Sequence, residues 1–317
     1  MKRVSSTVVF LLLLSNGCEF NLGGDPPVAV FTVDRTIIMK AESVQFTDRS
    51  GHDPTSWNWD FGDGNTSSGQ SPLHAYTEAG TFSVSLTVTN EKGSDTYSRL
   101  DLIRVSSGSV TDKDGNTYKT VIIGQQEWMA ENLKVTHFPD GNEIPFIESN
   151  SEWDALQSND KAYSFYDNSS SNGDTYGALY TWAAAMNGSM SSDLNPSGVQ
   201  GACPEGWHIP SEAEWIQLIN YLGWEDAGGK LKETGTTHWD SPNEGASNES
   251  GFTGVPGGVH NILGFYDSMG MKGSWWSSTE SNVVPAWRRS MYHVSNRVGS
   301  GEIHKATGLS VRCLRDQ

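Results

Sequence analysis

The feature that most constrains the fold of this chain is a tight turn that leads directly into a helix. The turn spans residues 203–211, where proline and glycine residues enclose two aromatic side chains and follow a cysteine. Ser211 and Glu214 form a capping box at its end, and Gly223 stands where a helix-terminating glycine belongs. The apolar residues between them recur with helical spacing: Trp215, Leu218, Ile219 and Leu222. This pattern predicts a fixed scaffold element, and we expect its partner to be the closing segment, residues 308–313.

The N-terminal segment predicts export. A basic start is followed by an apolar run at residues 8–14, which is too short to span a bilayer, and by small residues before Cys18. This arrangement resembles the lipobox of bacterial lipoproteins, in which the cysteine is lipidated and becomes the mature N-terminus. We therefore interpret residues 1–18 as a lipoprotein signal peptide with a lipidated Cys18, and residues 19–26 as a tether. Secretion with a free Cys18 is the alternative.

Two cysteines remain, Cys203 and Cys313, which is an even number in a chain expected to be exported. A disulfide between them would close a long loop and contribute about 4–5 kcal/mol in the chain-entropy model. Zinc ligation is the alternative, but two isolated cysteines do not have the spacing of a zinc site. We therefore predict a disulfide between Cys203 and Cys313.

Residues 27–106 alternate in the manner of a half-buried β-sheet. In residues 82–89 every even position is apolar and every odd position is serine or threonine. The same period of two returns around Phe46 and Trp59. Turn signals that combine glycine with asparagine, aspartate or alanine separate these runs. Short strands at even spacing predict an all-β immunoglobulin-like sandwich.

Residues 57–64, Trp-Asn-Trp-Asp-Phe-Gly-Asp-Gly, resemble the signature of the PKD domain, an immunoglobulin-like module of extracellular proteins. Residues 74–82 fit the second half of that family's pattern. The resemblance covers the whole of residues 27–106 and implies a spacer or interaction module. Asp60 and Asp63 could ligate calcium. Aspartates in such turns more often bond their own backbone, and we favour that interpretation.

Residues 107–317 combine short helices with glycine-rich sequence. Residues 176–186 predict a helix in addition to the one that starts at Ser211, and an Asp-Gly turn predicts a hairpin within residues 110–123. Two late strands are predicted, at residues 287–293 and 309–313. Helices followed by looped, short-stranded sequence indicate an α+β domain.

Six motifs in this region carry a second resemblance. They lie at residues 128–133, 176–180, 203–215, 227–232, 275–280 and 310–313. The set resembles the Fibrobacter succinogenes major paralogous domain of exported and lipid-anchored bacterial proteins. The resemblance implies an architecture similar to C-type-lectin-like and formylglycine-generating-type domains, and it implies no particular activity. We therefore expect a PKD domain at residues 27–106, followed by a C-type-lectin-like α+β domain at residues 107–317.

Composition and spacing argue against several classes of function. A net charge of −17 disfavours nucleic acid, which requires clustered lysine and arginine. The histidines are scattered without the spacing of a zinc site, and no Gly-x-Ser-x-Gly elbow is present. A formylglycine-generating oxidase needs reactive thiols, which the expected disulfide would consume. Calcium-dependent sugar binding needs a Glu-Pro-Asn type triplet, from which residues 241–243 depart at Ser241. We expect no cofactor.

The remaining signal is aromatic. Most of the twelve tryptophans lie between Trp128 and Trp287, and aromatic rings serve both as platforms for sugars and as anchors at protein interfaces. The alternative is that most of them fill the core, because a loop-rich fold needs large side chains to bury area. Five residues of the late glycine-rich region are the candidates for ligand binding: Trp275, Trp276, Trp287, Arg288 and Tyr292.

Taken together, these features predict a protein that is lipid-anchored to the bacterial cell envelope, at the outer membrane surface. We expect a PKD spacer that carries a recognition domain for polysaccharide or for another surface macromolecule. A formylglycine-generating-type or hydrolytic enzyme is one alternative, although the sequence favours binding over catalysis. A purely structural envelope protein is the other.

Overall fold

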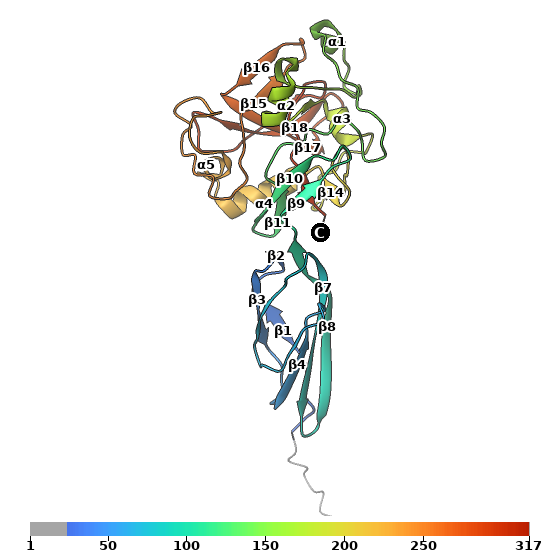
Figure 1. Cartoon of the computed structure of the whole chain (residues 1–317), viewed down its shortest axis with the longest axis vertical. Helices are drawn as coiled ribbons and strands as arrows, with labels where there is room; N and C mark the ends of the chain where they lie inside the picture. The colour runs from blue at the N-terminus through green and yellow to red at the C-terminus, as the bar shows by residue number, and fades with distance from the viewer. Residues whose placement is uncertain (1–23, 317) are drawn as a thin grey trace, which may run out of the picture.

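The computed structural model describes residues 24–316, which fold into two domains placed end to end (Figure 1). The N-terminal domain ends with strand β8 (Gly93–Ser106), and the C-terminal domain begins with strand β9 (Ser109–Thr111). Only Ser107 and Gly108 separate the two strands. The expected signal peptide and Cys18 lie outside the described residues. Within residues 24–316, no helix is long and apolar enough to cross a membrane.

The N-terminal domain is a sandwich of two sheets, one ordered β1-β3-β6 and the other β2-β8-β7-β4-β5. Its remaining strands are β1 (Phe31–Val33), β2 (Ile37–Met39), β3 (Ser43–Asp48), β4 (Ser56–Asp60), β5 (Thr66–Ser67), β6 (Leu73–Ala75) and β7 (Gly80–Asn90). The expected period of two is present in β7, where Val84, Leu86 and Val88 are buried. They pack in one cluster with the fully buried Trp59 of β4. The predicted immunoglobulin-like sandwich is confirmed.

The aspartates after β4 brace their own turn. Asp60 Oδ1 accepts a hydrogen bond of 2.9 Å from the backbone N–H of Gly62, and Asp63 Oδ1 accepts one of 3.0 Å from that of Asn65. Gly62 has φ of 79°, and a Cβ there would stand 2.3 Å from the carbonyl oxygen of Ser83. The turn therefore requires glycine, and turn bracing is the observed role of both carboxylates.

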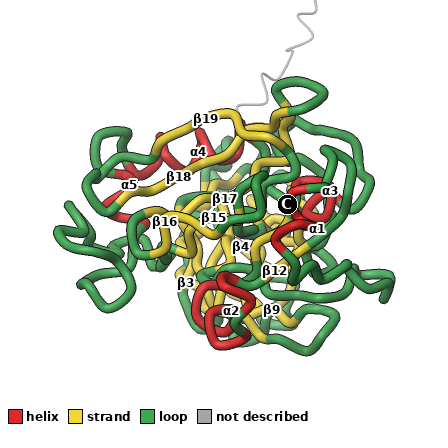
Figure 2. Tube along the Cα trace, turned by 90° about the horizontal axis from the view of Figure 1, so that it is seen from above, coloured by secondary structure: helices red, strands yellow, loops and turns green. Residues whose placement is uncertain are grey.

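The C-terminal domain is rich in short strands and contains few, short helices. Figure 2 shows loops and turns wrapped around a centre of strands. One sheet has the order β14-β20-β11-β10-β9 and another the order β17-β18-β19. These strands are β10 (Thr117–Ile123), β11 (Gln126–Met129), β14 (Trp207–His208), β17 (Lys272–Glu280), β18 (Pro285–Tyr292), β19 (Gly299–His304) and β20 (Leu314–Arg315). Two small ladders pair β12 (Tyr163–Ser164) with β13 (Leu179–Tyr180), and β15 (Gly257–His260) with β16 (Tyr266–Met269).

The predictions of elements whose ends are marked by turn or capping residues in the sequence are confirmed. The hairpin forms between β9 and β10, with Thr111 opposite Thr117. Helix α4 (Glu212–Leu222) begins after Ser211, and both hydrogen bonds of its capping box are present. The late strand at residues 287–293 is found as β18. The remaining helical elements are α1 (Asn150–Asp154), η1 (Tyr166–Asn168), α2 (Ser170–Tyr176), α3 (Trp182–Met186) and α5 (Ala227–Leu231).

The helix predicted at residues 176–186 is wrong in its first half. Gly177 has φ of 79° and ends α2, and a Cβ there would lie 2.9 Å from the carbonyl oxygen of Leu133. Leu179 and Tyr180 are then extended as β13, and α3 begins only at Trp182. This close approach to a distant segment cannot be deduced from helical periodicity.

The last strand is also displaced from its predicted place. Residues 309–313 form only isolated bridges, in which Leu309 pairs with Tyr180 and Ser310 with Trp275, and the regular strand is β20. The segment passes between neighbours on both sides and is buried throughout. The alternating sequence of the segment therefore reflects burial rather than a regular strand, because its residues bond to several different segments of the chain.

Candidate functional site

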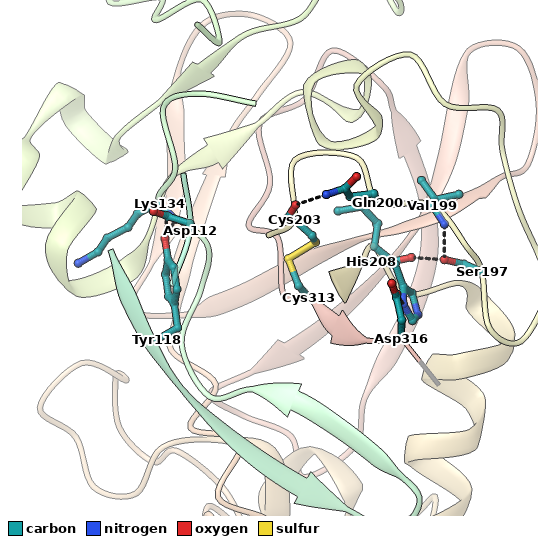
Figure 3. Close-up of a disulfide and its surroundings, with 11 residues drawn as sticks. Asp112, Tyr118, Lys134, Ser197, Val199, Gln200, Cys203, His208, Cys313 and Asp316 are labelled. Atoms are coloured by element: carbon teal, nitrogen blue, oxygen red, sulfur yellow. Dashed lines mark hydrogen bonds and ion pairs between the residues drawn. A yellow bond between two sulfur atoms is a disulfide. The ribbon is translucent and has the colours of Figure 1, made fainter. Parts of the chain in front are cut away.

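The predicted disulfide between Cys203 and Cys313 is present and fully buried (Figure 3). It connects the turn before β14 to the residue before β20. The carbonyl oxygen of Cys313 also accepts a hydrogen bond of 3.0 Å from the backbone N–H of Met129 in β11. The opening turn is thus part of the scaffold that holds the five-stranded sheet together.

Two of the five ligand-binding candidates belong to the core. Trp275 and Trp276 have no exposed surface. The indole N–H of Trp275 donates to Asn132 Oδ1 at 2.8 Å, and that of Trp276 donates to the carbonyl oxygen of Tyr180 at 2.7 Å. The prediction that these two side chains bind a ligand is therefore wrong. They lie on β17, the central strand between β18 and the segment at residues 309–313.

The other three candidates are partly exposed on β18 but do not converge. Successive side chains of a strand point to opposite faces of the sheet, so Trp287 projects away from Arg288 and Tyr292. Tyr292 lies under the ammonium of Lys272, with 5.6 Å between Nζ and the ring centroid. Trp287, Arg288 and Tyr292 therefore do not form one aromatic site, and a binding role for each of them stays a prediction.

A buried polar centre lies where the sequence motifs meet. Arg312 is fully buried, and its Nε and Nη2 donate to Asn132 Oδ1 at 3.0 Å and 2.7 Å. Its Nη1 donates to the carbonyl oxygens of Met129 and Phe252. Burial lowers the pKa of Arg312 to about 9, because the guanidinium rests on oxygens that carry no full charge. This centre fixes the backbone that surrounds the adjacent pocket.

That pocket has a volume of about 170 Å³ and is open to solvent beside Asn132. Its wall includes His238, whose Nδ1 lies 2.8 Å from Glu233 Oε2. Glu131 and Lys134 line the same pocket. The pocket therefore presents an imidazole, carboxylates and an ammonium within one small volume.

Two further pockets extend it along residues 130–139. The middle one measures about 440 Å³ and the far one about 420 Å³. Lys134 and Asp174 line both the first and the middle pocket, and His137 lines both the middle and the far one. Each pocket therefore shares lining residues with the next, and we call the three together the 130–139 groove.

The middle of the groove contains a second pair of histidine and carboxylate. His137 Nδ1 lies 2.6 Å from Asp114 Oδ1. Burial by itself raises the pKa of Asp114, but hydrogen bonds from Thr136 and the contact with His137 lower it overall, so the carboxylate stays ionised. Phe165 adds an aromatic ring to this wall.

The far pocket lies beside the disulfide and ends the groove. Asp112 lines it, and its Oδ1 accepts hydrogen bonds of 2.9 Å from the backbone N–H groups of Asp114 and Asn116. Carboxylates outnumber lysines along the whole groove. The carboxylates are Asp112, Asp114, Glu131, Asp174, Glu205 and Glu233, and the lysines are Lys113 and Lys134.

Sequence reasoning missed this site, although a signal for it was present. The motifs at residues 128–133 and 176–180 reach the groove through Glu131 and Gly177, and Glu233 directly follows the motif at residues 227–232. Glu131 and Glu233 lie inside or next to these motifs, but the sequence does not show which residues of other segments lie beside them. Only the fold brings them together.

Comparison with known proteins identifies both domains. The model of the Fibrobacter succinogenes major domain matches residues 121–315, and a PKD domain model matches residues 24–105. Collagenase ColQ1 of Bacillus cereus is 35% identical over 79 residues, which cover 24% of this chain and 8% of the collagenase. The pre-pro-metalloprotease PrtV of Vibrio cholerae is 56% identical over 43 residues, which cover 13% of this chain and 5% of PrtV. The chain therefore spans less than a tenth of the length of either relative.

Two solved structures each match about a quarter of the chain. The PKD1 domain of Vibrio anguillarum Epp is 35% identical and covers 26% of this chain and 100% of its own, with a TM-score of 0.23. A structure of carbohydrate-binding modules from the β-sandwich superfamily is 27% identical and covers 28% of this chain and 40% of its own, with a TM-score of 0.26. With a PKD domain at its N-terminal side and the larger match over residues 121–315, the chain belongs to the family of the Fibrobacter succinogenes major domain.

Proposed function

We propose that this chain is a binding module of the bacterial cell surface, and that its C-terminal domain binds polysaccharide along the 130–139 groove. The row of neighbouring pockets carries the proposal. A small-molecule site is one closed pocket, whereas three pockets in a row suit an elongated polymer; Lys134 and Asp174 line both the first and the middle one, and His137 lines both the middle and the far one.

The side chains of the groove suit hydroxyl groups. Carboxylates accept hydrogen bonds from hydroxyls, and the pairs His238–Glu233 and His137–Asp114 place an imidazole beside each acceptor. Phe165 provides an apolar face between them. Because carboxylates outnumber lysines, a neutral or amine-bearing polymer fits this groove better than a polymer rich in uronic acids.

The arrangement of the two domains supports a spacer role for the PKD domain. The chain enters it beside the β7–β8 turn, where Asn90 Nδ2 donates to the carbonyl oxygen of Asp25. It leaves at Ser106, the opposite end of a 14-residue strand that is about 45 Å long at the usual rise. The groove-bearing domain is therefore displaced from the chain's entry point by the length of the PKD domain (Figure 1).

The location follows from the same proposal. Lipidation of Cys18 would attach the chain to the envelope, at the outer membrane surface, and the PKD domain would hold the C-terminal domain away from it. We include a C-type-lectin-like arrangement of the C-terminal domain in this proposal, because that architecture binds ligands through its loops. The buried disulfide suits an oxidising compartment.

The test is binding of the chain from residue 24 onward to immobilised polymers. A neutral glucan and a glucosamine polymer with free amines are expected to retain it, and a uronic-acid polymer is not. Glu233→Gln is expected to weaken binding roughly tenfold or more, the scale of one lost charge-assisted hydrogen bond. Glu249→Gln serves as the matched control, because Glu249 is exposed and does not line the groove.

Several outcomes would contradict the proposal. If the chain with Glu233→Gln is still retained on a polymer and the chain with Trp287→Ala is not, the binding site lies on β18. Release of new reducing ends from a bound polymer would favour the hydrolytic alternative. Failure of every polymer to bind would favour a structural envelope protein. The formylglycine-generating alternative requires reactive thiols, whereas Cys203 and Cys313 are joined in a disulfide.

A further inference from the structure

A separate cleft lies between the two domains, away from the 130–139 groove. It has a volume of about 570 Å³, which is in the range of ligand sites, and such sites favour domain interfaces. Two arginines reach it from opposite sides, Arg104 from β8 of the PKD domain and Arg315 from β20 of the C-terminal domain. In a chain with a net charge of −17, two guanidinium groups facing one cavity are an exception to the surrounding electrostatics.

Arg104 has a donor without a partner. Its Nη1 donates to the carbonyl oxygen of Asp316, while its Nε is buried and has no hydrogen-bond partner in the part of the chain that the structure describes. A buried donor without an acceptor costs about 1–3 kcal/mol, and more when it carries charge. The Nε edge of a guanidinium is the edge that binds an oxyanion with two parallel hydrogen bonds.

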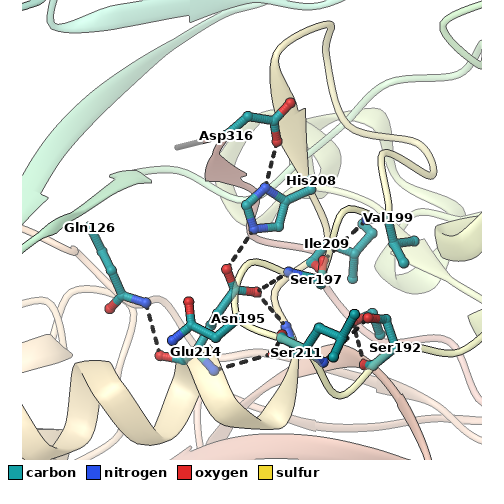
Figure 4. A network of polar contacts seen from close by, with 12 residues as sticks. Gln126, Ser192, Asn195, Ser197, Val199, His208, Ile209, Ser211, Glu214 and Asp316 are labelled. Atoms are coloured by element: carbon teal, nitrogen blue, oxygen red, sulfur yellow. Dashed lines mark hydrogen bonds and ion pairs between the residues drawn. The ribbon is translucent and has the colours of Figure 1, made fainter. Parts of the chain in front are cut away.

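The nearest carboxylates are already engaged. Glu127 accepts hydrogen bonds from Ser106, Thr120 and Arg315, and it is almost fully buried. The carboxylate of Asp316 lies 2.6 Å from Nδ1 of His208, a contact visible in Figure 4.

The electrostatic balance at Arg104 agrees with this geometry. Burial and the neighbouring Arg315 lower the pKa of Arg104, and they outweigh the opposing effects of Glu127 and Asp316. Asp101, at the rim of the cleft, is exposed to solvent. Asp101 and Asp316 line the cleft as well, so the feature that favours an oxyanion is the unpartnered Nε of Arg104 and not an excess of positive charge.

We propose that this cleft binds an oxyanion, the carboxylate or phosphate group of a small ligand, between Arg104 and Arg315. Thr81 and Gln125 line the same cleft and carry further donors, a hydroxyl and an amide. Ile37 and Leu102 also line it. The site thus suits a ligand with one anionic group and a carbon skeleton, and binding would join the two domains.

The test is calorimetric titration of the chain from residue 24 onward, with inorganic phosphate and glucuronate as separate probes. Saturable binding of phosphate alone would identify a phosphate site, and binding of glucuronate alone would identify a carboxylate site. Either result supports the proposal. Because Glu233 does not line this cleft, Glu233→Gln is expected to leave this binding unchanged.

Variants locate the site. Arg104→Gln is expected to weaken binding roughly tenfold or more. Arg104→Lys keeps the charge but loses the planar guanidinium with its paired donors, and it is expected to weaken binding as well. Arg99→Gln is the matched control on the same strand, because Arg99 does not line the cleft. Thermal unfolding of each variant confirms that it folds. Absence of saturable binding of both probes, or binding unaffected by either change at Arg104, would overturn the proposal.

Discussion

Buried cations organise the loops of the C-terminal domain at the scale of single residues. Lys232 is fully buried, and its Nζ donates to the carbonyl oxygens of Glu244, Tyr292 and Ser295 at 2.8–3.0 Å. Arg312 acts in the same way at the motif centre. Loop segments have carbonyls that no ladder satisfies, and one buried cation supplies several donors at a single point.

Replacement of Arg312 measures how much such a centre contributes. Arg312→Met removes the Arg312 donors from the Met129 and Phe252 carbonyls and leaves Asn132 Oδ1 with the Trp275 N–H alone, so we expect a loss of about 3 kcal/mol or more in the free energy of unfolding. Urea unfolding followed by tryptophan fluorescence provides the measurement. Arg297→Met is the control, since that side chain is largely exposed. Equal losses in the two variants would refute a special role for Arg312.

The burial of Trp275 and Trp276 shows the limit of prediction at this scale. Their glycine-rich surroundings suggested exposed loops, whereas both residues lie in the middle of β17. The burial arises from the distant segment at residues 309–313, which covers the strand. A strand that is buried on both faces shows no alternation of apolar and polar residues in its own sequence.

At the scale of elements, the start of helix α4 is joined to the end of the chain. Glu214 Oε2 closes the capping box on the Ser211 backbone N–H at 2.9 Å, and its Oε1 lies 2.8 Å from Nε2 of His208 (Figure 4). The other ring nitrogen of His208 contacts Asp316. A buried imidazole between two carboxylates thus connects α4 to the residue after β20.

This arrangement predicts a pH-dependent stability. Burial by itself lowers the pKa of His208, but Glu214 and Asp316 raise it overall above the ordinary value of 6.5. The folded state therefore binds the proton more tightly than the unfolded state. The contribution is fully present below pH 6.5 and is lost as the pH rises through the folded pKa. Urea unfolding between pH 6 and pH 9 is expected to show this decline in the wild type.

His208→Gln isolates the effect. The variant is expected to lack most of the decline between pH 6 and pH 9. The exposed His52 of the PKD domain provides the matched control, and His52→Gln is expected to keep the wild-type profile. If His208→Gln retains the full pH dependence, another group is responsible for it.

Prediction of elements succeeded where all the determinants were local. The cap, the apolar stripe and the terminal glycine of α4 lie within a few turns of one another, so the sequence predicted both of its ends. The break at Gly177 and the short helix α5 depend on distant backbone. Gly228 and Gly229 of α5 each pack against a carbonyl, of Arg297 and of Gly245, closely enough to exclude a Cβ. The groove was missed for the same reason, because its walls come from several separate segments.

At the scale of the whole molecule, the domain order and the disulfide were predictable and the junction was not. The two sequence signatures defined the domains, and the even number of cysteines beyond Cys18, in a chain expected to be exported, defined the pairing. The contacts of Arg104 with Asp316, and of Thr36 with Gln125, connect residues that no motif relates. Interdomain geometry depends on such contacts and is not encoded in either signature.

The disulfide closes 110 residues of sequence and should dominate the stability of the C-terminal domain. Replacement of both cysteines by serine is expected to lower its free energy of unfolding by about 4–5 kcal/mol. The PKD domain lies outside this loop, so its own unfolding transition should not move and serves as an internal control. An unchanged midpoint for the C-terminal domain would show that packing alone holds β14 against β20.

The position of the groove soon after the domain junction has a mechanical consequence. With the N-terminus anchored and a polymer held in the groove, tension would enter the C-terminal domain at β9 and leave it within residues 130–139. The load would pass through the PKD strands and then through β10 and β11, in series. Glu233 and His238 of the groove lie inside the loop that the disulfide closes, so the load borne there would reach a covalent bond, and a pulled molecule would yield first in its hydrogen-bonded strands.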